Sequence, residues 1–138
     1  MSNDEVLPLG IKQMIDWNKY PNFSEDEFKC SHTGLCAMDE EFLEVLQEIR
    51  TKYGKSMVIS SGYRHETHPI EARKSKAGEH TMGRCADIAV SGSDAVELIR
   101  IALECGITRI GVQQKGQGRF LHLGIGARDL PNPWIWSY

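Results

Sequence analysis

The sequence predicts an α+β fold built on a small, mainly antiparallel sheet with flanking helices. Its 138 residues correspond to one domain of ordinary size. Two helical patterns precede the first strand pattern, and one further helix interrupts the later strands, an order that is typical of this class. Hydrophobic residues make up 41% of the chain and charged residues 25%, which is the composition of a folded globular protein.

The chain opens with two helical patterns. Ser24 and Glu27 form a capping-box pattern, which predicts the start of a short helix. Asp39 can cap a second helix over residues 40–53, and Gly54 provides its stop. The apolar residues of this second helix recur at helical spacing: Phe42, Val45, Leu46 and Ile49.

Two predicted strands flank the longest polar segment. Residues 56–60 are rich in β-forming side chains and predict a strand. Residues 64–84 are polar throughout, and a loop of this length in a small domain is more often functional than not. Residues 85–90 predict the next strand.

The second half of the chain predicts a helix and two more strands. Ser91 or Ser93 can cap a helix over residues 94–105. Residues 109–113 and 119–123 predict strands joined by a glycine-containing loop. The last residues are rich in proline and aromatic side chains: Pro131, Pro133, Trp134, Trp136 and Tyr138. We expect this tail to pack onto the core, with the lining of a substrate cleft as the alternative.

Charge and hydropathy exclude several classes of protein. The chain has 16 Lys and Arg against 19 Asp and Glu, a net charge of −3, unlike the basic surface of a nucleic-acid binder. No apolar run approaches the roughly 18 residues of a membrane span. Residues 1–17 are acidic and polar and lack the pattern of a secretory signal. We therefore expect a protein made in the cytoplasm, with no nucleic-acid partner and no membrane span.

The cysteines are too few and too dispersed for a disulfide framework, and we interpret all four as thiols: Cys30, Cys36, Cys85 and Cys105. A zinc knuckle formed by Cys30, His32 and Cys36 is the alternative, although its spacing is unusual and a second ligand pair is missing. On this interpretation the cysteines are bystanders to any catalytic metal.

A histidine and an aspartate around the second predicted strand are candidates for metal binding. Asp87 is surrounded by apolar residues, and burying its charge is costly unless it is paired or coordinates a metal. A tight turn at Gly83 would let His80, on a loop, converge with Asp87 on the strand. The alternative is an ion pair between Asp87 and Arg64 or Arg84.

His122 lies in the last predicted strand, where alternation places it on the same face as Phe120 and Gly124. A single histidine in an apolar strand is more often a core residue than a ligand. Together with His80 and Asp87, it completes two histidines and one carboxylate, a ligand set of catalytic zinc that leaves a fourth position for water. Such a water can ionise near neutral pH and attack a carbonyl group.

Three motifs follow one another in a specific order: Ser60-Ser61-Gly62-Tyr63-Arg64, His80-x-x-Gly83-x-x-Ala86-Asp87 and Phe120-Leu121-His122. As a set they resemble the zinc D-Ala-D-Ala carboxypeptidase and L-alanyl-D-glutamate endopeptidase family, also called LAS metallopeptidases. The resemblance covers about residues 22–138 and extends to the small, phage-type, single-domain members.

This resemblance implies a fold like that of the D-Ala-D-Ala peptidases and the hedgehog signalling domain. It implies one zinc peptidase domain over residues 22–138, preceded by a polar lead-in over residues 1–21. His80, Asp87 and His122 would be the zinc ligands.

The resemblance also implies a substrate and a route of catalysis. The substrate would be a peptidoglycan stem peptide, cut by carboxypeptidase or endopeptidase activity. Arg64 would point into the cleft and stabilise the charge that develops on the carbonyl oxygen, with an ion pair to Asp87 or Glu66 as the alternative. We expect a monomeric, phage-encoded protein that acts on the bacterial cell wall.

The sequence departs from the family pattern where an acid or base is expected. Gly124 stands where the small members carry an Asp, position 119 is Arg rather than an acid, and Gly78 replaces a common Ser. Candidates for the missing general base are Glu79, Glu66, His65, His68 and Asp129. If Gly124 is a real loss, Gly124→Asp should raise the rate. The alternative function is a catalytically weakened zinc-binding module, used to bind the wall or as a structural part of a virion.

Overall fold

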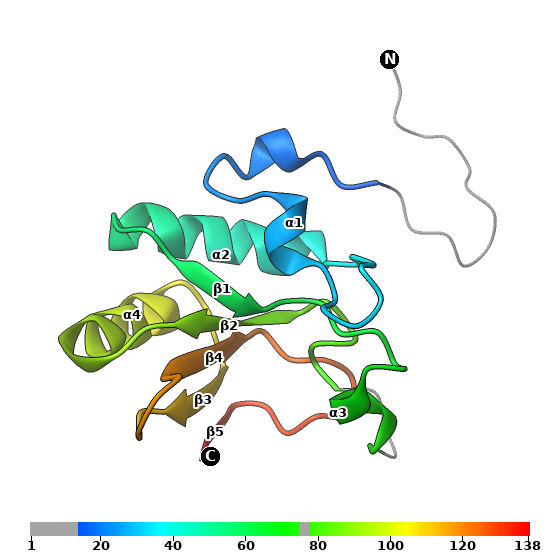
Figure 1. Cartoon of the computed structure of the whole chain (residues 1–138). Coiled ribbons are helices and arrows are strands. Elements are labelled where there is room, and N and C mark those ends of the chain that lie inside the picture. Colours follow the sequence, from blue (N-terminus) through cyan, green and yellow to red (C-terminus); the bar gives the residue numbers. More distant parts are fainter. Residues whose placement is uncertain (1–13, 75–77) are drawn as a thin grey trace.

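The computed structural model describes residues 14–74 and 78–138 (Figure 1). Residues 1–13 of the predicted lead-in lie outside the described part. The elements follow in this order: η1 (Trp17–Lys19), α1 (Glu25–Phe28), α2 (Glu40–Tyr53), β1 (Val58–Ser61), α3 (Pro69–Ala72), β2 (Cys85–Ala89), α4 (Gly92–Glu104), β3 (Arg109–Gln113), β4 (Phe120–Gly124) and β5 (Trp134–Ser137).

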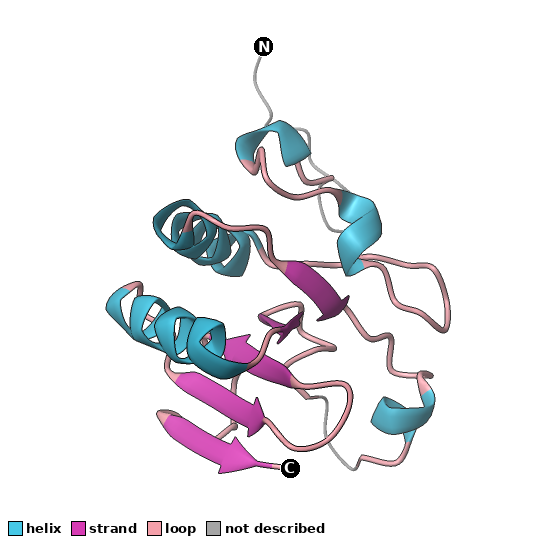
Figure 2. Cartoon of the chain, turned by 60° about the vertical axis from the view of Figure 1, so that its left-hand side comes forward, coloured by secondary structure: helices cyan, strands magenta, loops and turns pink. Residues whose placement is uncertain are grey.

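The strands form one open sheet of five strands in the order β1-β2-β4-β3-β5. Every neighbouring pair is antiparallel except β3 and β5, which run parallel. Helices α2 and α4 pack against each other on one side of the sheet, whereas α3 lies away from them (Figures 1 and 2). The predicted α+β class with a mainly antiparallel sheet is confirmed.

Strand alternation gives the sheet two faces: one packs in the core, and the other, which carries Asp87 and His122, is called the functional face below. On β2 and β4, Ile88 pairs with Leu121 and both are buried in the core. The next pair, Asp87 and His122, points to the opposite face, which α2 and α4 leave uncovered. The core joins this sheet face to the helices through large apolar side chains: Phe28, Phe42, Leu43, Leu46, Ile49, Leu98, Leu121 and Leu123.

Local capping explains why the first two helices begin and end where they do. The Glu27 carboxylate accepts a hydrogen bond from the backbone N–H of Ser24 at 2.9 Å, as half of a capping box. The Asp39 carboxylate accepts one from the N–H of Glu41 at 2.9 Å. Helix α2 ends at Gly54, whose φ of 71° is a left-handed cap. The bounds predicted for α2 are confirmed.

The polar segment 64–84 is not a continuous loop, because it contains the short helix α3. His68 caps this helix, since its ring Nδ1 accepts the N–H of Ile70 at 3.1 Å. Pro69 occupies the first helical position, where its missing N–H costs nothing. The other helices and strands that the sequence predicted stay within about two residues of the prediction, whereas η1 was not predicted.

The C-terminal tail forms the strand β5, which the sequence did not predict. It pairs in parallel with β3, with Arg109 opposite Trp134 and Gly111 opposite Trp136. Such pairing depends on register between distant segments, so no local pattern predicts it. In the part of the chain that is described, no helix has the length and apolar character needed to cross a membrane.

Candidate active site

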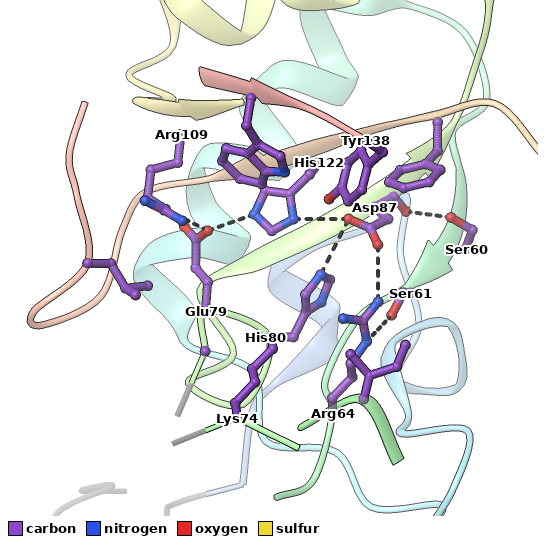
Figure 3. Close-up of a pocket in the computed structure, with 15 residues that line it drawn as sticks. Ser60, Ser61, Arg64, Lys74, Glu79, His80, Asp87, Arg109, His122 and Tyr138 are labelled. Carbon is purple, nitrogen blue, oxygen red and sulfur yellow. Dashed lines mark hydrogen bonds and ion pairs between the residues drawn. The ribbon is translucent and has the colours of Figure 1, made fainter. Parts of the chain in front are cut away.

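A cavity of about 720 Å³ lies on the functional face of the sheet (Figure 3). Its charged and ionisable lining includes Arg64, Glu79, His80, Asp87, Arg109 and His122. The three residues expected to bind zinc and the arginine expected beside them therefore line one cavity.

Register and one tight turn bring His80, Asp87 and His122 together. Asp87 on β2 lies directly opposite His122 on β4. The chain between His80 and β2 turns at Gly83, which has a φ of 68°. A Cβ atom on Gly83 would lie only 2.2 Å from the carbonyl oxygen of Ala37, so both the conformation and the space require glycine. The turn expected at Gly83 is present.

The contacts of Asp87 with the two histidines are as short as those between neighbouring zinc ligands. Oδ1 of Asp87 lies 3.3 Å from Nε2 of His80 and 3.1 Å from Nδ1 of His122. Tetrahedral zinc with ligands at about 2.0–2.1 Å separates its N and O donors by about 3.4 Å. The observed distances are close to that separation.

Hydrogen bonds on the far side of each ring set the two histidine tautomers. Nδ1 of His80 lies 2.7 Å from the carbonyl oxygen of Gly62, which can only accept, so Nδ1 carries the proton. Nε2 of His122 lies 2.7 Å from Oε1 of Glu79 and donates to that carboxylate. His80 Nε2 and His122 Nδ1 both face Asp87 Oδ1. If a cation replaced the protons shared there, the lone pairs of both nitrogens and the carboxylate could bind it.

The pKa shifts agree with a site built for positive charge. Burial alone would raise the pKa of Asp87, but hydrogen bonds and charges from His122 and His80 outweigh it and hold the pKa well below its usual range. Burial would lower the pKa of His122, but Asp87 and Glu79 outweigh it and raise that pKa. Asp87 is therefore ionised, and any metal ion bound by His122 would compete with a proton.

Arg64 lines the cavity and also holds the site together. Its guanidinium lies 3.4 Å from Oδ2 of Asp87 and 3.5 Å from Oε2 of Glu71, and its Nε donates to Oγ of Ser61 at 3.1 Å. Its side chain keeps 16% of its surface exposed, while that of Glu71 keeps 2%. The ion pair with Asp87 that the sequence left open is present, and the second partner is Glu71 rather than Glu66.

Cys85 is closer to the site than the sequence suggested. The donor atoms of His80, Cys85 and His122 lie within 4.8 Å of one another, so this thiol is not remote from the metal site. Cys85 is two residues before Asp87 on β2, and strand alternation was the signal that puts both on one face. In the absence of a metal ion, burial raises the pKa of the Cys85 thiol well above its ordinary value.

The other cysteines match the interpretation as thiols. All four cysteines are free. Within residues 14–74 and 78–138, the group of three donors that lie within 4.8 Å of one another is His80, Cys85 and His122, and Asp87 adjoins it through its contacts with both histidines. Cys30, His32 and Cys36 form no such group there.

Of the five candidates for the general base, only Glu79 lines the cavity. Glu66 and Asp129 are exposed, and the rings of His65 and His68 bond to Thr67 and Ser31 outside it. Burial would raise the pKa of Glu79, but its hydrogen bonds, first that with His122, outweigh burial and lower it.

Two further lining residues were not singled out as site residues by the sequence. Nε of Arg109 donates to Oε1 of Glu79 at 3.0 Å, and the Arg109 guanidinium lies 5.1 Å from the centre of the Trp136 ring. Trp136 in turn packs on His122, with ring centres 4.8 Å apart. Trp136 and Tyr138 both line the cavity, which was the alternative expected for the tail.

A buried cluster of His80, Cys85 and His122 that could hold a metal ion, with Asp87 in contact with both histidines and a cavity beside them, is the kind of site found in metal-dependent hydrolases. The comparison with protein families gives the particular family: the model described as Peptidase M15 matches residues 21–124, and the chain belongs to the peptidase M15 family of zinc metallopeptidases. The family implies a peptide substrate. Among curated proteins, no relative matches the chain.

Proposed function

We propose that the protein hydrolyses peptide bonds in peptidoglycan stem peptides, as a D-Ala-D-Ala carboxypeptidase or an L-Ala-D-Glu endopeptidase, with zinc held by His80, Asp87 and His122. The observation that supports this proposal most is the contact of Asp87 Oδ1 with one nitrogen of each histidine, at 3.3 Å from His80 and 3.1 Å from His122, while the other nitrogen of each ring is hydrogen-bonded elsewhere. When bound there, zinc would polarise a carbonyl group and lower the pKa of a water molecule.

Arg64 supplies the second element of the proposed mechanism. Peptide hydrolysis places negative charge on the carbonyl oxygen, and a fixed cation at that point stabilises the transition state more than the bound substrate. Glu71 and Ser61 fix the guanidinium from the side, and the partial exposure of Arg64 leaves it able to face a substrate.

The proposed substrate matches the lining of the cavity. Arg64, Lys74 and Arg109 line the cavity, each in an ion pair with a carboxylate, and aromatic side chains from the tail supply apolar surface. Stem peptides carry free carboxylates, for which such cations are suited. We assign the whole activity to a domain over residues 22–138, with residues 1–21 as a lead-in, and propose a phage-encoded monomer made in the cytoplasm that acts on the cell wall.

One observation favours a second candidate function, a weakened zinc-binding module that binds the wall or forms part of a virion. Glu79 is the one cavity-lining group among the five base candidates, yet it accepts hydrogen bonds from His122, Arg109 and the backbone of Gly126. A carboxylate with three donors is poorly placed to take a proton from water. Loss of general-base assistance typically costs about 10²–10⁴-fold in rate, so this alternative predicts slow or absent cleavage.

Digestion of purified peptidoglycan tests the two candidates. The zinc-loaded protein is incubated with the wall material, with and without a chelator, and the products are identified by mass spectrometry. New chain ends that form only without the chelator would support the peptidase and identify the bond that is cut. Binding to the wall without any new chain ends would instead support the zinc-binding module.

A further inference from the structure

The requirement for glycine at position 124 comes from lack of space for a side chain, since the backbone there does not have a left-handed conformation. It lies in β4, two residues after His122 and opposite Cys85. A Cβ atom added there would lie 1.9 Å from Oε2 and 2.4 Å from Cδ of Glu79. The Glu79 carboxylate therefore occupies the volume that a side chain at position 124 would fill.

The environment of Glu79 is that of a fixed anion. Only 2% of its side-chain surface is exposed. Its Oε1 accepts from Nε2 of His122 at 2.7 Å and from Nε of Arg109 at 3.0 Å, and its Oε2 accepts from the N–H of Gly126 at 2.8 Å. These donors come from β4, β3 and the turn after β4, so the carboxylate is held from several sides.

From these contacts we infer that Glu79 is a positioning residue: it fixes the ring of His122 so that Nδ1 is the metal-binding atom. The inference rests on the proposed function and deepens it. His122 has two ring nitrogens, and the strong bond from Nε2–H to Glu79 leaves the lone pair of Nδ1 directed at Asp87 Oδ1, 3.1 Å away. Packing of the ring against Trp136 limits its rotation as well.

The Glu79 carboxylate comes from the segment before β2, whereas an Asp side chain at position 124 would come from β4. Glu79 is adjacent to His80, so one short segment supplies both a proposed ligand and the group that orients the other histidine. Partners of this kind contribute about 10–100-fold to metal affinity in other sites. An Asp at position 124 should therefore substitute for the Glu79 carboxylate, but only in a variant such as Glu79→Ala, in which the space above position 124 is free.

The test measures zinc affinity by competition with a chromophoric chelator, on metal-free full-length protein below its unfolding temperature. We expect Glu79→Ala to weaken zinc binding by about 10–100-fold. The matched control is Glu66→Ala, which removes an exposed glutamate outside the cavity and should bind zinc as wild type does. The double variant Glu79→Ala/Gly124→Asp should recover most of the lost affinity.

A spectroscopic measurement separates positioning from a merely structural role. The ¹⁵N chemical shifts of the His122 ring report which nitrogen carries the proton. In metal-free protein above the pKa of the ring, we expect an Nε2–H ring in wild type and a shift of the proton toward Nδ1, which faces Asp87, in Glu79→Ala. Cobalt(II) used in place of zinc should show a changed visible spectrum in Glu79→Ala and the wild-type spectrum in Glu66→Ala.

The outcomes separate the inference from the proposed function. If wild type and Glu66→Ala bind no zinc, the proposed function fails. If wild type binds zinc and Glu79→Ala binds it equally well with an unchanged tautomer, the inference alone is overturned. If Glu79→Ala does not fold, Glu79→Gln decides, because a neutral amide oxygen is a weaker acceptor than a carboxylate. Weaker zinc binding by Glu79→Gln then supports the inference, and unchanged binding overturns it.

Discussion

The substitution Gly124→Asp gives opposite expectations from the sequence and from the structure. The sequence predicts a gain in rate, because an Asp is usual at this position in small relatives. In the structure, the new Cβ would lie 1.9 Å from Oε2 of Glu79, far inside van der Waals contact. The new carboxylate would also bring a second negative charge into a buried space that Glu79 already fills. From the structure we therefore expect Gly124→Asp to make the protein less stable rather than the enzyme faster.

The size of this effect follows from two costs. Adding atoms to a well-packed interior costs typically about 1–3 kcal/mol, and like charges forced together in a buried space add to it. We therefore expect a loss of at least about 2 kcal/mol. For a domain of this size, about 1 kcal/mol lowers the Tm by about 4 °C, so the Tm should fall by about 8 °C or more.

Thermal unfolding of the metal-free protein, followed by circular dichroism, measures this loss. Gly124→Ala is the control for size without charge and should lower the Tm by less than Gly124→Asp does. In the Glu79→Ala background the space is free, so adding Gly124→Asp should raise the Tm rather than lower it. A Gly124→Asp protein that unfolds within about 2 °C of wild type, a shift worth only about 0.5 kcal/mol, would show that the Glu79 carboxylate is not where the structure places it.

Three further predictions concern charge and metal. Arg64→Ala should lower kcat more than it raises KM, because the oxyanion exists only in the transition state; steady-state kinetics on a stem peptide would contradict this if kcat were unchanged. In metal-free protein the pKa of His122 is raised, since Asp87 and Glu79 outweigh burial. The resulting stabilisation is complete below the unfolded value of about 6.5 and is lost as the pH rises through the folded pKa. Urea unfolding midpoints should therefore fall from about pH 6 to about pH 8 in metal-free protein, and a flat profile would argue against the raised pKa. Zinc affinity should rise over the same range, because the proton on His122 competes with the metal; isothermal titration calorimetry at each pH checks this, and pH-independent binding would count against His122 as a ligand.

Local sequence signals predicted the parts of the fold that local physics determines. Helix α2 was predicted from its Asp39 cap, its apolar spacing and the Gly54 stop, and β3 from a short run of β-forming residues. Strand β5 was not predicted, because its edges are set by pairing with β3 and its proline-containing approach looked like a packed tail.

In the candidate site, too, some residues could be predicted from the local sequence and others depend on long-range pairing of strands. His80, Asp87 and His122 were selected by residue type and motif order, and the structure brings them to one cavity. Cys85 could have been found from strand alternation with Asp87. The role of Glu79 could not have been found, because it depends on the space above Gly124, which exists only once β2 and β4 are paired.

The proposed function depends on zinc bound by His80, Asp87 and His122, with the nearby thiol of Cys85 outside the ligand set. Elemental analysis of extensively dialysed wild type, Asp87→Ala and Cys85→Ser tests it most directly, with circular dichroism to check that each variant is folded. We predict one zinc per chain in wild type and in Cys85→Ser, and its loss in Asp87→Ala. Zinc retained by Asp87→Ala, zinc lost from folded Cys85→Ser, or no zinc in wild type would each contradict this ligand set.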